Sequence, residues 1–293
     1  GKEGMKDDKT ITPAVITQCK NRRKITMLTA YDYSTAVILD ESGVDIVLVG
    51  DSLANVALGL QSTRDVGLEE MLYHAKAVCR GVKRALVLTD MPYSAYQCDS
   101  AGKNVSVPDA LQNALRLKND SACGALKIEW SQRCLEITEA VIGKGIAVCG
   151  HIGLTPQTAD ETGGFKTRGV SADEALNILA QAEALQKAGC FAVVMECVPE
   201  AVAGDIARKL SIPVIGIGAG RFCDGQVLVT NDMLGMNPGF RPRFVKRYAD
   251  LHSRVMNAAG DFIREVGDGS FPAPENTFKI KPEELASFRE RIT

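Results

Sequence analysis

Residues 190–196 read Cys-Phe-Ala-Val-Val-Met-Glu, a short apolar run that ends in a single carboxylate. A run of this kind, apolar at almost every position, is typical of a parallel strand covered on both faces. Seven further runs have the same character, at residues 25–30, 45–49, 85–89, 124–128, 145–149, 212–217 and 226–229. The sequence therefore predicts eight buried strands.

Helical patterns separate these strands, and glycines such as Gly43, Gly81 and Gly189 close several of them. Strands that alternate with helices predict a parallel α/β fold, and eight of them predict a (β/α)8 TIM barrel. A doubly wound open sheet is the alternative that the same pattern allows. The helices are expected at residues 33–42, 68–82, 107–121, 131–143, 171–188 and 199–210.

We expect one catalytic barrel domain over residues 24–293, since about 250 residues suffice for such a barrel. Residues 237–243 are expected to form a loop. Residues 266–278 are expected to form a loosely structured tail before a short C-terminal helix. Residues 1–23 form an N-terminal segment that opens at Gly1 rather than Met, and we interpret part of it as residues added in cloning.

Composition narrows the class of protein. A net charge of −2 gives no indication of a nucleic-acid or anionic-membrane partner, and no apolar run reaches the ~18–20 residues that span a bilayer. The first 24 residues are polar and mixed in charge, so we expect no signal peptide. Nine cysteines without a Cys-x-x-Cys pair predict buried thiols in a reducing compartment, so we expect a cytoplasmic location.

Polar residues follow or end several of the predicted strands. In a barrel all the carboxyl ends of the strands lie on one rim, around one mouth. The side chains expected to converge there are Asp51, Ser52, Asp90, Lys127, Glu129, His151 and Glu196.

Three of these side chains are carboxylates on consecutive strand ends. Asp51, Asp90 and Glu129 offer the oxygen ligands that Mg²⁺ prefers. The alternative is that each aspartate caps the helix that follows it. Three acids in this arrangement favour the metal.

Lys127 and Glu129 share one face of a strand, because side chains alternate with a period of two. A lysine beside carboxylates stays charged and can bind an anionic substrate, although a plain ion pair is the alternative.

Glu196 follows an apolar strand. Burial there favours the protonated carboxyl and so raises its pKa, which suits a general base; a helix cap is the alternative.

Two further features carry weaker signals. His151 can hydrogen-bond a substrate oxygen, and a structural histidine with satisfied hydrogen bonds is the alternative. The glycine-rich residues 216–220 resemble a phosphate-binding loop, but a tight turn is the simpler and preferred interpretation.

A set of motifs, in this order, resembles the ketopantoate hydroxymethyltransferase family from about Lys24 to Phe278. Gly-Asp-Ser-Leu at residues 50–53 and Cys-Gly-His-Ile-Gly-Leu-Thr-Pro-Gln at 149–157 are the most specific. The others are Leu-Thr-Ala-Tyr-Asp-Tyr at 28–33, Asp-Met-Pro-Tyr at 90–93, Lys-Ile-Glu at 127–129, Glu-Cys-Val-Pro at 196–199 and Ile-Gly-Ile-Gly-Ala-Gly at 215–220.

The resemblance implies a barrel of the phosphoenolpyruvate/pyruvate-binding superfamily and a homo-oligomer, often a decamer. It implies transfer of a hydroxymethyl group from 5,10-methylenetetrahydrofolate to 3-methyl-2-oxobutanoate through a Mg²⁺-stabilised enolate, the first committed step of pantothenate synthesis. By the matched motifs, Asp51 and Asp90 bind Mg²⁺ and Glu129 joins its shell. Asp51 and Asp90, with Ser52, Lys127 and His151, also contact the substrate.

Glu196 matches the family's proton acceptor.

The sequence departs from the family pattern at Trp130-Ser131 and Ala54-Asn55, and residues 98–107 predict a longer loop. These changes concern the shape of the pocket and its folate contacts. Two other functions compete with this one: a Mg²⁺-dependent lyase or mutase acting on keto acids without folate, and a barrel that only binds a small anion.

Overall fold

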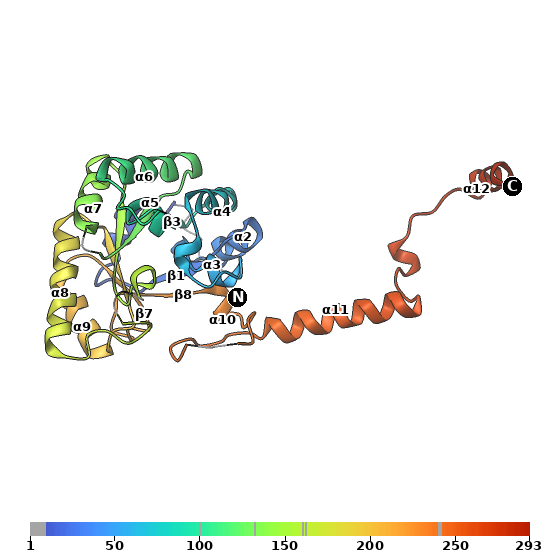
Figure 1. Cartoon of the computed structure of the whole chain (residues 1–293). Coiled ribbons are helices and arrows are strands. Elements are labelled where there is room, and N and C mark those ends of the chain that lie inside the picture. The colour runs from blue at the N-terminus through green and yellow to red at the C-terminus, as the bar shows by residue number, and fades with distance from the viewer. Residues whose placement is uncertain (1–9, 100, 132, 160, 162, 240–241) are drawn as a thin grey trace.

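A closed barrel of eight parallel strands, in sequence order, forms the body of the protein (Figure 1). The computed structural model describes residues 10–99, 101–131, 133–159, 161, 163–239 and 242–293. The barrel closes where β8 pairs with β1, with Ile25 opposite Gly225. The predicted (β/α)8 fold is therefore confirmed, and the open-sheet alternative is wrong.

The strands lie close to their predicted positions, with one correction. The run at 145–149 predicts a strand that ends before His151, but the strand starts later and continues through His151 to Gly153. Gly145 has a left-handed backbone (φ 80°) and belongs to the preceding turn. The strands are β1 (Ile25–Thr29), β2 (Ile46–Val49), β3 (Leu86–Asp90), β4 (Ala125–Glu129), β5 (Val148–Gly153), β6 (Ala192–Glu196), β7 (Val214–Ile217) and β8 (Gly225–Leu228).

Six longer helices cover the outside of the barrel, and all six were predicted from the sequence to within three residues at each end. Local signals define their ends: Asp32 accepts a hydrogen bond from the Thr35 N–H, and Gly43 (φ 90°) terminates the same helix. The six are α2 (Tyr33–Ser42), α4 (Leu68–Gly81), α6 (Val107–Ser121), α7 (Cys134–Gly143), α8 (Ala172–Lys187) and α9 (Glu200–Lys209).

The N-terminal segment closes the end of the barrel opposite the mouth. Ile11 and Ile16, the latter in the short helix α1 (Pro13–Gln18), join the cluster of inward-facing strand residues that fills the barrel. Thr17 donates a hydrogen bond to the carbonyl of Phe191, just before β6. The described part of residues 1–23 thus packs as part of the barrel, and residues 1–9 lie outside the described residues.

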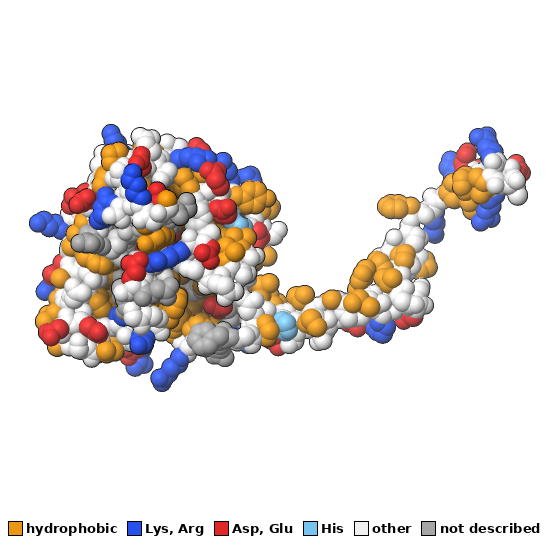
Figure 2. Space-filling view, viewed as in Figure 1, with side chains coloured by type: hydrophobic (Ala, Val, Ile, Leu, Met, Phe, Trp, Pro, Cys, Tyr) orange, Lys and Arg blue, Asp and Glu red, His pale blue; other side chains and the backbone are white. Residues whose placement is uncertain are grey.

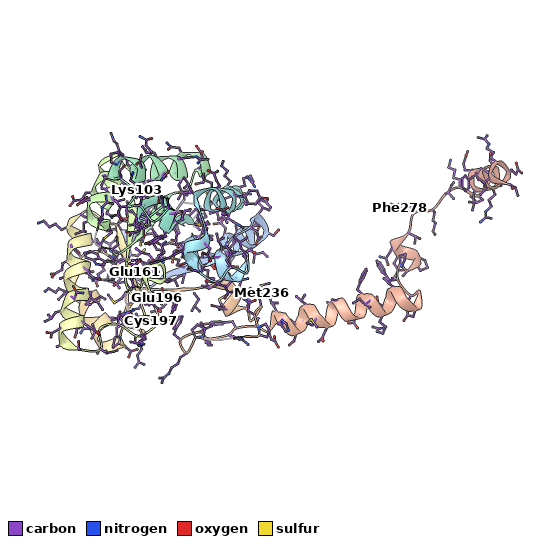
Figure 3. All side chains as sticks on the ribbon, viewed as in Figure 1. Lys103, Glu161, Glu196, Cys197, Met236 and Phe278 are labelled. Atoms are coloured by element: carbon purple, nitrogen blue, oxygen red, sulfur yellow. The ribbon has the colours of Figure 1, made fainter. Side chains whose placement is uncertain are left out.

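The C-terminal region extends away from the barrel as α11 (Leu251–Asp268), a 3-10 turn (Pro274–Asn276) and α12 (Pro282–Ile292) (Figure 1). Regular helix therefore covers residues 266–268, where a loose tail was expected, while the short C-terminal helix is confirmed. No residue of α11 is buried. Figure 2 shows apolar side chains along this arm, and Phe278 lies far from the barrel (Figure 3).

The outer faces of β1 and β8 lack a covering helix. Thr26 and Gln226 point outward from these strands and are exposed, whereas every residue of β2, β3 and β4 is buried. Helix α11 follows β8 in the chain and would complete the ring of helices there, but it projects away instead. Nowhere in the described residues is a helix long and apolar enough to cross a membrane.

Candidate active site at the barrel mouth

Strand register brings the predicted side chains together in pairs at the carboxyl ends of the strands. In the parallel ladder Asp90 of β3 lies opposite Lys127 of β4, and Glu129 of β4 lies opposite His151 of β5. Glu196 ends β6, next to β5. Because neighbouring strands are in lateral contact, these side chains form a continuous row around half of the mouth.

Asp51, Asp90 and Lys127 form the first part of this row. Lys127 Nζ lies 3.1 Å from Asp90 Oδ1, and the backbone N–H of Asp51 donates to Asp90 Oδ2 at 3.0 Å. All three side chains are buried. A lysine buried beside carboxylates is what an anionic substrate would require on this wall.

His151 connects the row to Glu196. Its Nδ1 lies 3.2 Å from Glu129 Oε1 and 3.3 Å from Lys127 Nζ, and its Nε2 lies 3.3 Å from Glu196 Oε2. The Glu196 side chain is 16% exposed, against 2% for Glu129. Glu196 is thus the most exposed carboxylate of the row.

Burial and neighbouring charges shift the pKa values of this cluster in opposite directions. Burial, reinforced by the charges of Asp90 and Glu129, raises the pKa of Asp51 well above its usual range. Burial and Lys127 lower the pKa of His151, but Glu129 and Glu196 outweigh them and raise it to about 9. Burial raises the pKa of Glu129, but His151 and Lys127 outweigh it, so that Glu129 stays ionised.

Gln157 and Tyr96 belong to the site and were not among the predicted site residues. The Gln157 side-chain NH2 donates to Asp51 Oδ2 (2.8 Å), and its backbone N–H donates to Glu129 Oε2 (3.0 Å). The Tyr96 hydroxyl donates to the side-chain amide oxygen Oε1 of Gln157 (2.6 Å). Gln157 ends the Cys-Gly-His motif, which is the signal that could have identified it. These buried hydrogen bonds fix the orientation of two carboxylates.

Two buried carboxylate oxygens remain available to a cation. Asp90 Oδ1 and Glu129 Oε1 accept no hydrogen bond within the described residues, although Lys127 and His151 lie at ion-pair distance from them. Across the described residues, no three His, Cys, Asp or Glu side chains are grouped as a complete metal cage. The donors present therefore fit an ion that takes only one or two protein oxygens and keeps waters, as Mg²⁺ does.

A strained backbone holds Glu196 in place. The next residue, Cys197, has φ 51°, in the left-handed region that a non-glycine residue adopts only when its surroundings force it to. Its N–H donates to the Ile217 carbonyl, and its carbonyl accepts from the Arg168 N–H. On the other side, a Cβ on Gly153 would lie 2.3 Å from the Glu196 carbonyl oxygen, so only glycine fits there.

A cavity of about 650 Å³ opens at the mouth. It is wide enough for more than a small keto acid, since pockets of 300–1,000 Å³ enclose whole drug-sized ligands. Ser52, which bonds the Tyr31 hydroxyl at 2.8 Å, lies on its wall. All seven residues predicted from the strand ends line it: Asp51, Ser52, Asp90, Lys127, Glu129, His151 and Glu196.

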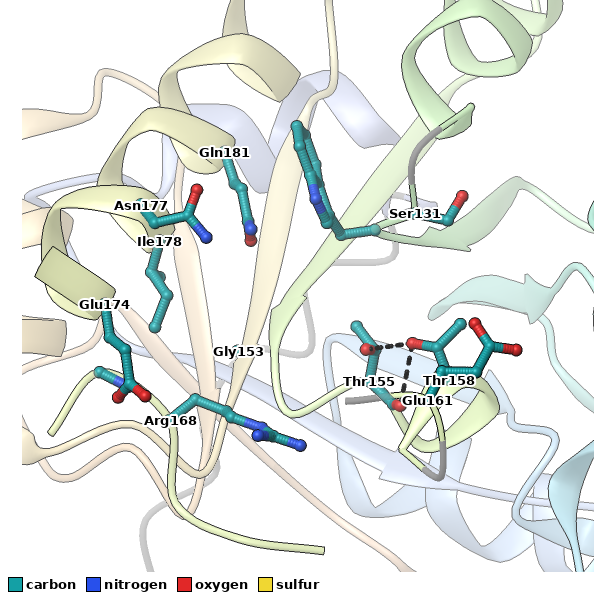
Figure 4. Close-up of a pocket in the computed structure, with 12 residues that line it drawn as sticks. Ser131, Gly153, Thr155, Thr158, Glu161, Arg168, Glu174, Asn177, Ile178 and Gln181 are labelled. Carbon is teal, nitrogen blue, oxygen red and sulfur yellow. Dashed lines mark hydrogen bonds between the residues drawn. The ribbon is translucent and has the colours of Figure 1, made fainter. Parts of the chain in front are cut away.

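Two of the residues that depart from the family pattern, Trp130 and Ser131, do not line the main cavity. Trp130 and Ser131 line a separate cavity of about 400 Å³ between the ends of β4 and β5 and helix α8, with Asn177 and Gln181 (Figure 4). The described part of the 98–107 loop folds back on itself through a bridge between Cys98 and Asn104. Asn55, by contrast, lines the main cavity.

The glycine-rich segment after β7 is a turn, as the simpler interpretation predicts. Gly218 and Gly220 both have left-handed backbones (φ 62° and 79°). A Cβ on Gly218 would lie 2.7 Å from the ring of Phe244, which packs against this turn. The absence of a side chain at Gly218 thus lets an aromatic ring approach the cavity wall.

Sequence relatives cover nearly the whole chain. Residues 10–274 match the family model described as ketopantoate hydroxymethyltransferase. The 3-methyl-2-oxobutanoate hydroxymethyltransferase of Acetivibrio thermocellus is 48% identical over 274 residues, which are 94% of each chain. The enzyme of the same name from Enterococcus faecalis is 48% identical over 262 residues, 89% of this chain and 93% of the relative.

Solved structures share the fold at much lower identity. Phosphoenolpyruvate phosphomutase from Streptomyces platensis subsp. rosaceus superposes with a TM-score of 0.57 at 15% identity, covering 96% of this chain and 98% of the other. A 2,3-dimethylmalate lyase of the PEP mutase/isocitrate lyase superfamily gives 0.56 at 13% identity, covering 96% and 99%. At such identities the likeness confirms the type of barrel alone.

Proposed function

The chain belongs to the ketopantoate hydroxymethyltransferase family, and from this premise we propose that the residues at the barrel mouth carry out that family's reaction. The substrate is 3-methyl-2-oxobutanoate, as the names of the relatives state. The single observation that best supports this proposal is the convergence of all seven predicted side chains on one cavity.

In this proposal the inner wall of the cavity binds the keto acid. Its carboxylate and ketone oxygens face Lys127, which Asp90, Glu129 and Asp51 keep charged although burial opposes that charge. Ser52 provides a hydroxyl on the same wall, and His151 provides an N–H near the oxygen of the product's new hydroxyl group. Such fixed donors orient the substrate without reorganisation during the reaction.

Asp51 and Asp90 would hold Mg²⁺, with Glu129 bound directly or through a water molecule. The two carboxylate oxygens without hydrogen bonds, Asp90 Oδ1 and Glu129 Oε1, support this assignment. So does the raised pKa of Asp51, because a nearby divalent cation would relieve the crowding of buried negative charge. When bound, the ion would polarise the ketone of the substrate and acidify the neighbouring C–H.

Glu196 would take the proton from C3 of the keto acid. The freed electron pair of C3 attacks the methylene carbon of 5,10-methylenetetrahydrofolate, so that a C–C bond forms and the bonds from this carbon to the folate nitrogens break. A water molecule supplies the hydroxyl of the new hydroxymethyl group, and its remaining proton and the proton held by Glu196 go to the two folate nitrogens. His151, 3.3 Å from Glu196, holds the carboxylate in place for this proton transfer.

The decisive test is an assay of the purified protein with 3-methyl-2-oxobutanoate, methylenetetrahydrofolate and Mg²⁺. We expect formation of 2-dehydropantoate that stops on chelation and returns when Mg²⁺ is added back, because the mouth carboxylates need the ion. Product is measured by mass spectrometry. Cleavage of a C–C bond in a keto acid without folate would instead identify a lyase, and binding without turnover would identify an anion-binding protein.

The proposal also includes a homo-oligomer larger than a dimer, for which the family resemblance suggests ten copies. The exposed apolar stripe of α11 supports it, because apolar surface of this extent is normally covered. The outer faces of β1 and β8 are bare and would accept a helix from a second copy. The stripe consists of side chains that are each at least half exposed: Val255, Met256, Phe262, Ile263 and Val266.

Ile263→Asp should break this assembly. A charge in the middle of the stripe would have to be buried without a partner in the interface, so we expect light scattering to report a smaller species than for the wild type. Asn257→Asp adds the same charge on the opposite face of α11 and should leave the mass unchanged. A wild-type mass near the 31.4 kDa of one chain would refute the oligomer.

A cytoplasmic location is part of the proposal. All nine cysteines are free thiols, and six of them are buried. Proteins that keep so many unpaired cysteines are typical of reducing compartments.

A further inference from the structure

The main cavity extends beyond the residues that the keto acid needs. Its outer wall comes from the segment 165–167 after β5, from α10 (Thr230–Met233) after β8, and from described residues between 237 and 245. These segments lie well apart on the rim of the barrel mouth, because β5 and β8 are three strands apart in the ring. A second, larger molecule could therefore span the mouth above the keto acid.

Asp232 of α10 is the feature of this outer wall that most needs a ligand. Its carboxylate takes part in no hydrogen bond and no ion pair among the described residues, although the residue is only partly exposed. Burial raises its pKa, and Arg247 opposes that effect. A partly desolvated carboxylate without a partner is costly unless a bound molecule brings N–H donors to it.

The backbone around Asp232 is rigid, as a recognition site requires. Two residues earlier, the Thr230 N–H donates to Thr29 Oγ1 (3.0 Å), and the Thr230 hydroxyl donates to the Thr29 carbonyl (2.5 Å). Both residues are buried. These bonds pin the start of α10 to the end of β1, so that Asp232 is held at a fixed place in the wall.

Aromatic and cationic side chains complete the outer wall. The ring of Phe244 lies against Gly218, and Phe165 is 71% exposed where it lines the cavity. Lys166 and Arg243 also line the cavity and are exposed, and neither forms an ion pair within the described part of the chain. The wall thus offers a carboxylate, flat apolar surface and two positive charges without an ion pair among the described residues.

We propose that this outer wall is the subsite for the folate that carries the one-carbon unit, with Asp232 accepting hydrogen bonds from the adjacent N–H groups of the reduced pterin ring. A carboxylate with two free oxygens matches two parallel N–H donors on one edge of a planar ring. Phe165 and Phe244 pack against the ring systems, and Lys166 and Arg243 contact the carboxylates of the glutamate tail. The inference rests on the proposed function, in which folate is the donor.

Asp232→Asn should raise the KM for methylenetetrahydrofolate about 10- to 100-fold, the usual worth of a hydrogen bond to a charged group. The same variant should bind tetrahydrofolate correspondingly more weakly in calorimetry. Its effect on solvent exchange of the C3 proton of 3-methyl-2-oxobutanoate, measured by NMR without folate, should be far smaller. Asp120→Asn, an exposed site on α6, is the matched control and should change none of these values.

Lys166→Gln and Arg243→Gln test the proposed contacts to the glutamate tail of the folate, independently of Asp232. Each should weaken a polyglutamylated folate more than the monoglutamate, and the difference should shrink at high salt. Equal affinity of Asp232→Asn and wild type for tetrahydrofolate would overturn the subsite, and so would equal losses of exchange and transfer. A wild-type protein that exchanges the C3 proton but never uses folate would instead overturn the proposed function.

Discussion

Asp51→Asn should abolish turnover and Mg²⁺ binding while the protein stays folded. Asparagine keeps the size of the side chain and can keep the hydrogen bond from Gln157, which Asp51 Oδ2 accepts at 2.8 Å. What it removes is one of the two anionic oxygens proposed to hold the ion. Loss of an outer partner of a metal ligand already costs about 10–100-fold in metal affinity, so loss of a ligand should cost more.

In the metal-free protein, Asp51→Asn should not lower the free energy of unfolding, although it abolishes turnover. Burial, with Asp90 and Glu129, raises the folded-state pKa of Asp51, so the folded chain binds more protons than the unfolded chain at pH values above the usual aspartate pKa. Ionising Asp51 therefore lowers the free energy of unfolding as the pH rises through that window. Asparagine has no such charge, and the apoprotein of Asp51→Asn should melt no lower than the wild type at pH 7.

Calorimetric titration with Mg²⁺ and thermal melting, both with and without the ion, check these two statements together. Asp90→Asn is a less clean variant, because Asp90 also pairs with Lys127 and accepts from the Asp51 N–H, so its loss leaves a buried lysine poorly compensated. Asp120→Asn again serves as the surface control. Wild-type Mg²⁺ affinity in Asp51→Asn would contradict the assignment of this residue as a ligand.

The barrel could be predicted because its signal is local. Parallel strands buried on both faces leave continuous apolar runs, and the residues that end them are polar only where the strands reach the mouth. Asp90, Glu129 and Glu196 are the last residues of their strands. Convergence of these carboxylates on one cavity therefore followed from strand order alone.

Other parts of the site depend on contacts that spacing does not encode. His151 lies inside β5, because Gly150 and Gly153 do not interrupt that strand, and the sequence pattern alone predicted too early an end. Gln157 and Tyr96 matter through buried hydrogen bonds between segments far apart in the chain. Helix α11 contains Gly260 and Gly267, which weaken a helical pattern, and none of its residues is buried against the described part of the chain.

The position of Glu196 makes it the strongest candidate for the base. It is the more exposed carboxylate of the pair on either side of His151, and the strained backbone of Cys197 fixes the strand end from which it projects. In the proposed site, Asp51, Asp90 and Glu129 would already supply the oxygens that Mg²⁺ commonly takes from a protein. In this proposal Glu196 is therefore left to accept a proton from a substrate bound beside it on the same row.

Glu196→Gln should lower the rate of solvent exchange at C3 of 3-methyl-2-oxobutanoate about 10²–10⁴-fold, the usual worth of a positioned base. Glutamine keeps the shape, and its carbonyl oxygen can still accept from His151, so binding of the keto acid and of Mg²⁺ should survive. Proton NMR in D₂O measures the exchange without folate, and Glu136→Gln on the exposed face of α7 is the matched control. If exchange persisted at the wild-type rate while hydroxymethyl transfer failed, Glu196 would act in the later, folate-dependent step, and another group would have to remove the C3 proton.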